Sequence, residues 1–240
     1  MLNTILIFIR SVIFHLAVFI FTLFYTLISI AFVHLIPYHL RFRYLTIWSR
    51  AVIFFARLIC GISYKVVGLE NIPKETSYIV MAKHQSQWET FFLVNLLQPL
   101  RIVCKQELLK LPLGVGYGIS LLNPITIDRS NPRQALKQIQ STGLHRLNED
   151  NMPVLIFPEG TRTAIGKAGK YARSAAQLAI AANKPVIFIS LNSGHFWPDK
   201  GFMKYPGQIE IHINTADKSI EQCAQQIINY LIENGFIAGN

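Results

Sequence analysis

The residues of this 240-residue chain best suited to chemistry are a histidine and a glutamate five positions apart, His84 and Glu89. They follow an apolar run at residues 78–82, which has the composition of a buried strand. In a continuous helix this spacing would place the two side chains on different faces, but a strand–loop–helix turn can fold the carboxylate back towards the imidazole. A carboxylate on one ring nitrogen fixes the tautomer and leaves the other nitrogen free to take a proton from a hydroxyl. The pair predicts a histidine base, and a structural histidine beside a solvated glutamate is the alternative.

A second polar cluster, residues 157–162, has the sequence Phe-Pro-Glu-Gly-Thr-Arg and ends another apolar run. Its proline stops the strand, Gly160 permits an unusual backbone angle, and Arg162 carries a planar guanidinium that matches a phosphate. Residues 166–170 add two glycines and two lysines. The cluster predicts a phosphate-binding turn, with a basic surface turn as the alternative.

Two further cations, Lys105 and Arg129, stand at the ends of short apolar runs. A parallel sheet would bring both to the same edge as His84 and Arg162, where α/β proteins gather their chemistry. Ser86 could be imagined as a nucleophile, but it lacks a Gly-x-Ser-x-Gly elbow and is better interpreted as a cap of the following helix.

After residue 61, short apolar runs alternate with helical periodicity, which predicts an α/β fold with a largely parallel central sheet covered by helices. We expect strands at 63–67, 78–82, 101–104, 125–128, 152–157, 185–191 and 208–213, and helices at 89–97, 132–147, 171–182 and 220–231. Asn131 and Pro132 supply a cap and a first helical residue for the second of these helices.

The first 60 residues differ from the rest, and we assign them to membrane-associating helices that precede an α/β domain at 61–240. Residues 11–36 carry no formal charge over 26 positions, which is enough to cross a bilayer with some tilt. A signal peptide is a weaker interpretation, because the run is long and no small-residue cleavage site follows. Residues 47–62 contain two arginines and fit an amphipathic helix at the interface. A hairpin that dips into one leaflet fits both stretches equally well.

Basic residues are concentrated after the apolar run, where residues 41–65 hold four arginines and a lysine, whereas Arg10 alone precedes the run. This bias predicts an inner (cytoplasmic) membrane protein whose catalytic domain faces the cytoplasm. The net charge of +10 is not accompanied by a nucleic-acid-binding motif, so an anionic membrane and a phosphorylated substrate explain it more simply. The three cysteines show no paired spacing, and we expect neither disulfides nor a metal site.

Four blocks in this order resemble the glycerolipid acyltransferase family, and within it most closely the bacterial 1-acyl-sn-glycerol-3-phosphate acyltransferases. The first block is His84 with Glu89, and the third is residues 157–162, which match letter for letter. The second runs from Lys105 to Asp128 and Arg129, and the fourth is the apolar, proline-containing stretch 184–189. The likeness covers roughly residues 61–214. It departs from the family at Glu89, where aspartate is commoner, and at Lys83, which adds positive charge where relatives often have Asn or Asp.

The resemblance implies transfer of a fatty acyl group from acyl carrier protein or coenzyme A to the 2-hydroxyl of 1-acyl-glycerol-3-phosphate, giving phosphatidic acid. His84 would be the base and Glu89 its partner. Substrate binding would fall to Lys105, Arg129, Glu159, Gly160, Thr161 and Arg162. Backbone amides near Gly160 are candidate oxyanion donors, and no cofactor is implied beyond the thioester co-substrate. The implied partners are lysophosphatidic acid, the thioester donor and membrane lipids.

Three other functions remain open. The nearest is a sibling acyltransferase that acts on glycerol-3-phosphate or another lysolipid. A membrane-bound lipid hydrolase would use the same histidine and glutamate to activate water. A non-catalytic module for anionic lipids would use the basic edge alone.

Overall fold

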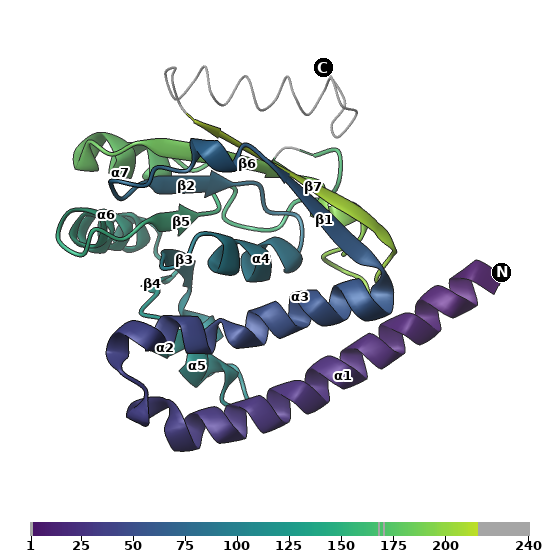
Figure 1. The fold of residues 1–240 in the computed structure, drawn as a ribbon. Helices are drawn as coiled ribbons and strands as arrows, with labels where there is room; N and C mark the ends of the chain where they lie inside the picture. The colour runs from purple at the N-terminus through teal and green to yellow at the C-terminus, as the bar shows by residue number, and fades with distance from the viewer. Residues whose placement is uncertain (1, 168, 170, 216–240) are drawn as a thin grey trace.

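The computed structural model describes residues 2–167, 169 and 171–215, and it has a seven-stranded sheet at its centre. The strand order is β1-β7-β6-β2-β5-β3-β4 (Figure 1). The five strands from β6 to β4 are mutually parallel, and β7 with its parallel neighbour β1 runs in the opposite direction. The predicted α/β fold with a largely parallel sheet is confirmed.

The strands are β1 Ile62–Val67, β2 Ile79–Ala82, β3 Arg101–Lys105, β4 Ile125–Ile127, β5 Val154–Ile156, β6 Val186–Leu191 and β7 Gly207–Thr215. The helices are α1 Leu2–Phe32, α2 Tyr38–Leu45, α3 Ile47–Cys60, α4 Trp88–Leu96, α5 Val115–Leu121, α6 Pro132–Asn148 and α7 Ser174–Ala182. All seven predicted strands are present. The helix expected at 220–231 lies outside the described residues, and α2 and α5 were not predicted.

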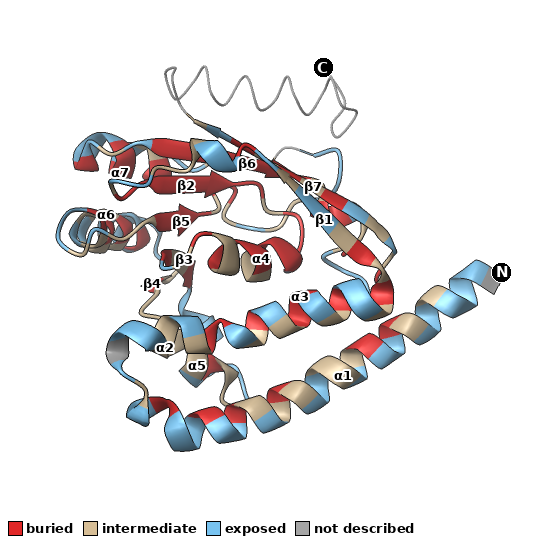
Figure 2. Ribbon diagram, viewed as in Figure 1, coloured by how far each residue is buried: buried red, intermediate tan, exposed pale blue. Residues whose placement is uncertain are grey.

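Alternate residues of each central strand face opposite layers, because successive side chains of a strand point to opposite faces. Val80, Leu155 and Ile187 pack in one buried cluster with α4 and α3. Ile79, Val154 and their neighbours pack in a second cluster with α6 and α7. The central strands are therefore covered on both sides (Figure 2), which explains their unbroken apolar composition.

Local sequence signals decide several boundaries. Asn131 caps α6 by accepting a hydrogen bond from the Gln134 amide at 3.1 Å, and Pro132 is the first helical residue, as expected. Gly61 ends α3 in the left-handed region with φ +73°, a conformation that favours glycine. The predicted helix at 171–182 begins later than expected, at Ser174.

The N-terminal helices α1 and α3 lie antiparallel along the lower side of the molecule in Figure 1. Two hydrogen bonds join α1 to α3. At the C-terminal end of α3, Arg10 donates from Nε to the Ile59 carbonyl at 2.7 Å, and at its N-terminal end Trp48 donates from Nε1 to Thr22 Oγ1 at 2.9 Å. Phe14 of α1 is part of the same buried cluster as α3, α4 and the sheet. The segment we assigned to residues 1–60 thus shares its core with the α/β part. By length and composition, α1 is one helix that could cross a membrane.

Candidate active site

The imidazole of His84 and the carboxylate of Glu89 are in contact, with Nδ1 3.0 Å from Oε1. His84 follows the end of β2, and Glu89 lies in the first turn of α4, so the intervening turn folds the carboxylate back as the sequence predicted. Because an ionised carboxylate only accepts hydrogen bonds, Nδ1 carries the proton and Nε2 is left as a base. The ring also stacks on Phe157, with centroids 4.0 Å apart. The pair can therefore act as an oriented general base.

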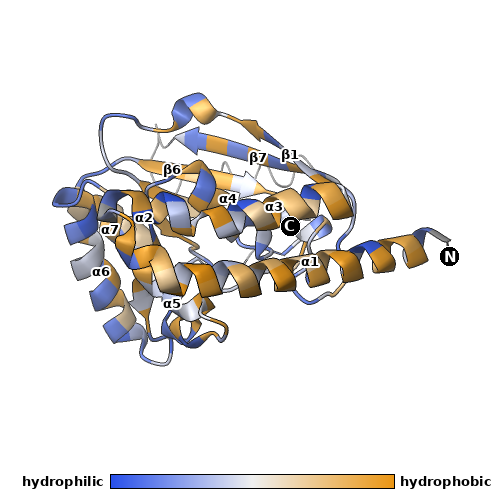
Figure 3. Ribbon diagram, turned by 60° about the horizontal axis from the view of Figure 1, so that its bottom comes forward, coloured by the Kyte–Doolittle hydropathy of each residue, from blue (hydrophilic) through white to orange (hydrophobic). Residues whose placement is uncertain are grey.

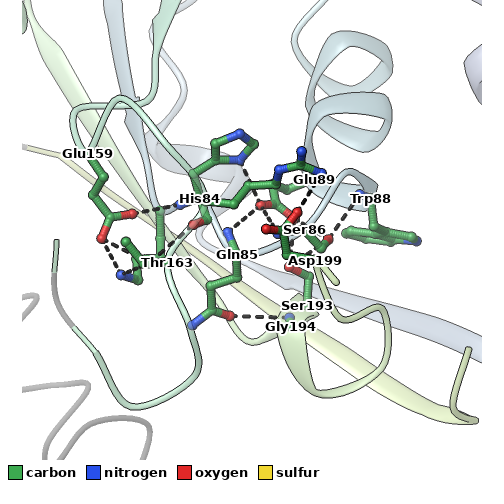
Figure 4. A network of polar contacts seen from close by, with 12 residues as sticks. His84, Gln85, Ser86, Trp88, Glu89, Glu159, Thr163, Ser193, Gly194 and Asp199 are labelled. Atoms are coloured by element: carbon green, nitrogen blue, oxygen red, sulfur yellow. Dashed lines mark hydrogen bonds and ion pairs between the residues drawn. The ribbon is translucent and has the colours of Figure 1, made fainter. Parts of the chain in front are cut away.

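Glu89 is fully buried and accepts hydrogen bonds at both oxygens (Figure 4). Oε1 accepts from the backbone amides of Gln85 and Ser86 at 2.6 and 2.7 Å, and Oε2 accepts from the hydroxyls of Ser86 and Ser193 at 2.6 Å each. Burial by itself would raise the pKa of Glu89, but the hydrogen bonds from His84, Ser193 and Ser86 outweigh it and leave the pKa below its usual value. The carboxylate is consequently ionised at neutral pH.

The local sequence explains why this turn forms. Ser86 and Glu89 have the serine-x-x-glutamate spacing of a capping box, in which the glutamate reaches back to the backbone amide of the capping residue. Ser86 Oγ also accepts from the amide of Trp88, the first residue of α4, at 3.0 Å, while the residue at the cap position itself is Gln87. Glu89 therefore holds His84 and, at the same time, accepts hydrogen bonds from the free backbone amides just before α4.

A second buried network lies on the other side of His84. Lys83 and Glu159 form an ion pair in which the side chains are 2% and 0% exposed. Glu159 Oε2 accepts from the His84 backbone amide at 3.1 Å, and Oε1 accepts from the Gly169 amide at 3.0 Å. Lys83 Nζ also donates to Thr163 Oγ1 at 2.7 Å. This network fixes the backbone of His84 to the turn that follows β5.

A cavity of about 430 Å³ opens in front of His84. Five of the eight predicted site residues line it, namely His84, Lys105, Arg129, Thr161 and Arg162. Its remaining wall is mostly apolar and comes from α1, α3, α4, β3 and α5. The cavity therefore combines a base, three cations and space for hydrocarbon.

Comparisons with known proteins agree with this geometry. A family model described as acyltransferase matches residues 63–192. A 1-acyl-sn-glycerol-3-phosphate acyltransferase of Pseudomonas aeruginosa is 43% identical over 209 residues, which are 87% of this chain and 80% of that protein. The chain belongs to the acyltransferase family.

A further relative supports the same assignment, and a solved structure shares the fold. A 1-acyl-sn-glycerol-3-phosphate acyltransferase of Limnanthes douglasii is 31% identical over 68% of this chain and 59% of its own length. The crystal structure of the 1-acyl-sn-glycerophosphate (LPA) acyltransferase PlsC from Thermotoga maritima matches with a TM-score of 0.73 at 21% identity, and covers 94% of this chain and 93% of that one. The second likeness shows a shared fold.

Three of the four acyltransferase blocks meet at one edge of the sheet, because the strands that precede them are parallel. His84 follows β2, residues 157–162 follow β5, Lys105 ends β3, and Arg129 follows β4. The fourth block, residues 184–189, includes the first four residues of β6, which is the neighbour of β2 on the side opposite β5. The sequence predicted this convergence from strand ends alone.

Three predicted site residues do not line the cavity of this acyltransferase. Glu89 is buried behind His84, and Glu159 is buried against Lys83, so we assign Glu159 to positioning the His84 backbone rather than to binding substrate. Lys83 adds no free positive charge, because Glu159 pairs with it. Gly160 takes φ +65° as expected, but its amide donates to the Phe157 carbonyl at 3.0 Å and is occupied within the turn.

Two residues that contact predicted site residues, Ser193 and Asp199, were not predicted from the sequence. Ser193 contacts Glu89, and Oδ1 of Asp199 lies 2.7 Å from Nη1 of Arg162. Both lie in the connection that follows β6. The sequence did contain a signal for Ser193: polar residues come directly after the buried strand at 186–191, and this strand ends at the same edge of the sheet as β2.

Proposed function

We propose that this acyltransferase transfers a fatty acyl group from an acyl thioester to the 2-hydroxyl of 1-acyl-sn-glycerol-3-phosphate, giving phosphatidic acid. The observation that carries the proposal is the shared cavity, where the His84 imidazole, three cations and a largely apolar wall meet. A phosphate needs the cations, and an acyl chain needs the apolar wall. The names of the Pseudomonas and Limnanthes relatives support the same acceptor.

In the proposed mechanism, His84 Nε2 removes the proton of the acceptor 2-hydroxyl as its oxygen attacks the thioester carbonyl carbon. The anionic Glu89 stabilises the resulting imidazolium, because it is held against Nδ1. The tetrahedral intermediate then collapses, the carbon–sulfur bond breaks, and the thiolate takes the proton from Nε2. Acyl carrier protein or coenzyme A is the donor, and the proposed reaction uses no further cofactor.

The direct test is purified protein in detergent, supplied with acyl-coenzyme A or acyl carrier protein and a panel of acceptors. We expect phosphatidic acid by mass spectrometry with 1-acyl-glycerol-3-phosphate, and equal amounts of thiol and product. Preferential acylation of glycerol-3-phosphate or of another lysolipid would assign a sibling acceptor. Thiol release with free fatty acid and no acceptor dependence would instead indicate a hydrolase.

Arg162 is expected to bind the acceptor phosphate, since its side chain lines the cavity and is 32% exposed. Asp199 pairs with one guanidinium nitrogen of Arg162, and the guanidinium carries further N–H donors that a phosphate can use. Replacing Arg162 with alanine removes a charged hydrogen-bond donor, which is worth about 1.5–3 kcal/mol. We expect the KM for lysophosphatidate to rise by about 10- to 150-fold. Steady-state kinetics with monoacylglycerol as acceptor provide the control. Because this acceptor has no phosphate, its KM should change little in the variant. An equal loss with both acceptors would assign Arg162 another role.

For the membrane-associated part, we propose that α1 and α3 lie along the cytoplasmic leaflet. The buried stripe of α1 contains Ser11, Thr22, Thr26 and Ser29, and its outer face exposes apolar residues such as Phe24, which is 61% exposed. α3 likewise exposes Leu58 at 65%. Figure 3 draws both helices largely in the hydrophobic colour. An apolar outer face over a polar inner stripe suits a helix that contacts lipid on one side and protein on the other.

This orientation predicts that both ends of α1 are on the cytoplasmic side. In a protein whose native cysteines are replaced by serine, we would introduce Asn3→Cys or Leu35→Cys, two exposed positions at opposite ends of the apolar segment. A membrane-impermeant maleimide should label both variants in inverted membrane vesicles and neither in intact spheroplasts. Labelling of one position from each side would show instead that α1 spans the bilayer.

A further inference from the structure

The connection after β6 contributes a buried hydroxyl to the catalytic pair. Ser193 is 0% exposed and lies just beyond Leu191, the last residue of β6. Its Oγ donates to Glu89 Oε2 at 2.6 Å across 104 residues of sequence. Gly194 in the same turn donates its amide to Gln85 Oε1 at 3.3 Å, so this turn is attached to the His84 loop at two points.

The donors around Glu89 have different origins. His84 Nδ1, the amides of Gln85 and Ser86, and the Ser86 hydroxyl all belong to the turn that contains Glu89. Among the described residues, Ser193 is the one donor to this carboxylate from another part of the sheet edge. The hydroxyls of Ser86 and Ser193 lie 3.1 Å apart. Because each carries one hydrogen, both can donate to Oε2 at once, and the carboxylate is then held from two independent elements.

We propose that Ser193 is a positioning residue of the catalytic pair, which fixes the Glu89 carboxylate so that it holds the His84 imidazole in the reactive orientation. The proposal rests on the proposed function, in which His84 is the base. Ser193 does not line the cavity, so it acts through Glu89 and not through substrate. Removing its hydroxyl should therefore change the rate of the chemical step and leave substrate binding unchanged.

The experiment compares Ser193→Ala with Ser190→Ala in the full-length enzyme. Ser190 is a matched control on β6: it is 2% exposed, and its Oγ has no hydrogen-bond partner among the described residues. We expect Ser193→Ala to lower kcat about tenfold with both KM values within twofold. Ser190→Ala should retain kcat within twofold. Thermal unfolding of both variants, followed in detergent, separates this effect from a general loss of stability.

A double-mutant cycle tests whether Ser193 acts through Glu89. In a Glu89→Gln background, the further change Ser193→Ala should lower kcat less than twofold, because the carboxylate that the hydroxyl orients is already gone. The same tenfold loss in both backgrounds would overturn the proposal. So would a normal kcat in Ser193→Ala, a change confined to KM, or an equal loss in Ser190→Ala.

The design also separates this inference from the proposed function. If the wild-type enzyme transfers no acyl group to lysophosphatidate, or if His84→Ala remains active, the proposed function itself fails. If the wild type is active and His84→Ala is not, while Ser193→Ala behaves as wild type, then the positioning role of Ser193 alone is wrong.

Discussion

Replacing His84 with alanine is expected to lower kcat for acyl transfer by about 100- to 10,000-fold, the usual contribution of a general base. The reason is geometric: Nδ1 is held by Glu89, and Nε2 is directed to the cavity side of the pair. Without the imidazole, the acceptor hydroxyl has no group to receive its proton. Phosphatidic acid formation under saturating donor and acceptor measures the effect.

The matched control for this variant is His145→Ala. The His145 side chain is 58% exposed on α6, outside the cavity, and should be replaceable without loss of activity. The His84 variant should keep the thermal midpoint within a few degrees of wild type if it remains folded. A folded His84→Ala enzyme with near-normal transfer would eliminate the proposed mechanism.

The Glu159→Ala variant is expected to lose the most stability, about 3–5 kcal/mol of the free energy of unfolding. The substitution leaves the Lys83 ammonium buried at 2% exposure with no carboxylate to balance it. It also removes the acceptor of the His84 backbone amide, so activity should fall together with stability. Urea titration in detergent, followed by tryptophan fluorescence, measures the loss.

Two comparisons make this prediction specific. The double variant Lys83→Met, Glu159→Met removes both charges and should recover part of the lost stability, because no unpaired buried charge remains. Asp150→Ala breaks an ion pair with Arg146 whose side chains are 29% and 23% exposed, and should cost less than about 1 kcal/mol. A cost for Glu159→Ala no larger than that of Asp150→Ala would mean that the buried pair does not support the fold.

The strand ends that carry the predicted site residues are visible in the sequence because they are local features. Apolar runs mark the strands, and parallel strands bring their carboxyl ends to one edge, so His84, Lys105, Arg129 and Arg162 could be placed together before any contact was known. The same reasoning could not distinguish the roles of the acidic residues. Glu89 and Glu159 both follow buried strands, and their partners, Ser193 and Lys83, are respectively 104 and 76 residues away.

Glu89, which stands where the family more often has aspartate, shows what the sequence could and could not predict about this site. Glutamate is one methylene longer than aspartate, so the sequence predicted that the loop would have to reposition the carboxylate for it to contact His84. In the structure, the longer side chain reaches the amides of Gln85 and Ser86 as well as the imidazole. The capping-box spacing of Ser86 and Glu89 was visible in the sequence, but the five donors that meet at this carboxylate were not.

The sequence by itself determined the fold class, the apolar helices α1 and α3, and the strand ends that carry the reactive residues, because these depend on composition and short-range periodicity. The tertiary structure alone decided which side chains face the cavity and which are buried behind it. It also decided how α1 packs, since Arg10 and Thr22 bond to α3 and leave the apolar face outward. The burial of these side chains and the packing of α1 depend on contacts between segments far apart in the sequence, and those contacts form only when the whole chain is closely packed.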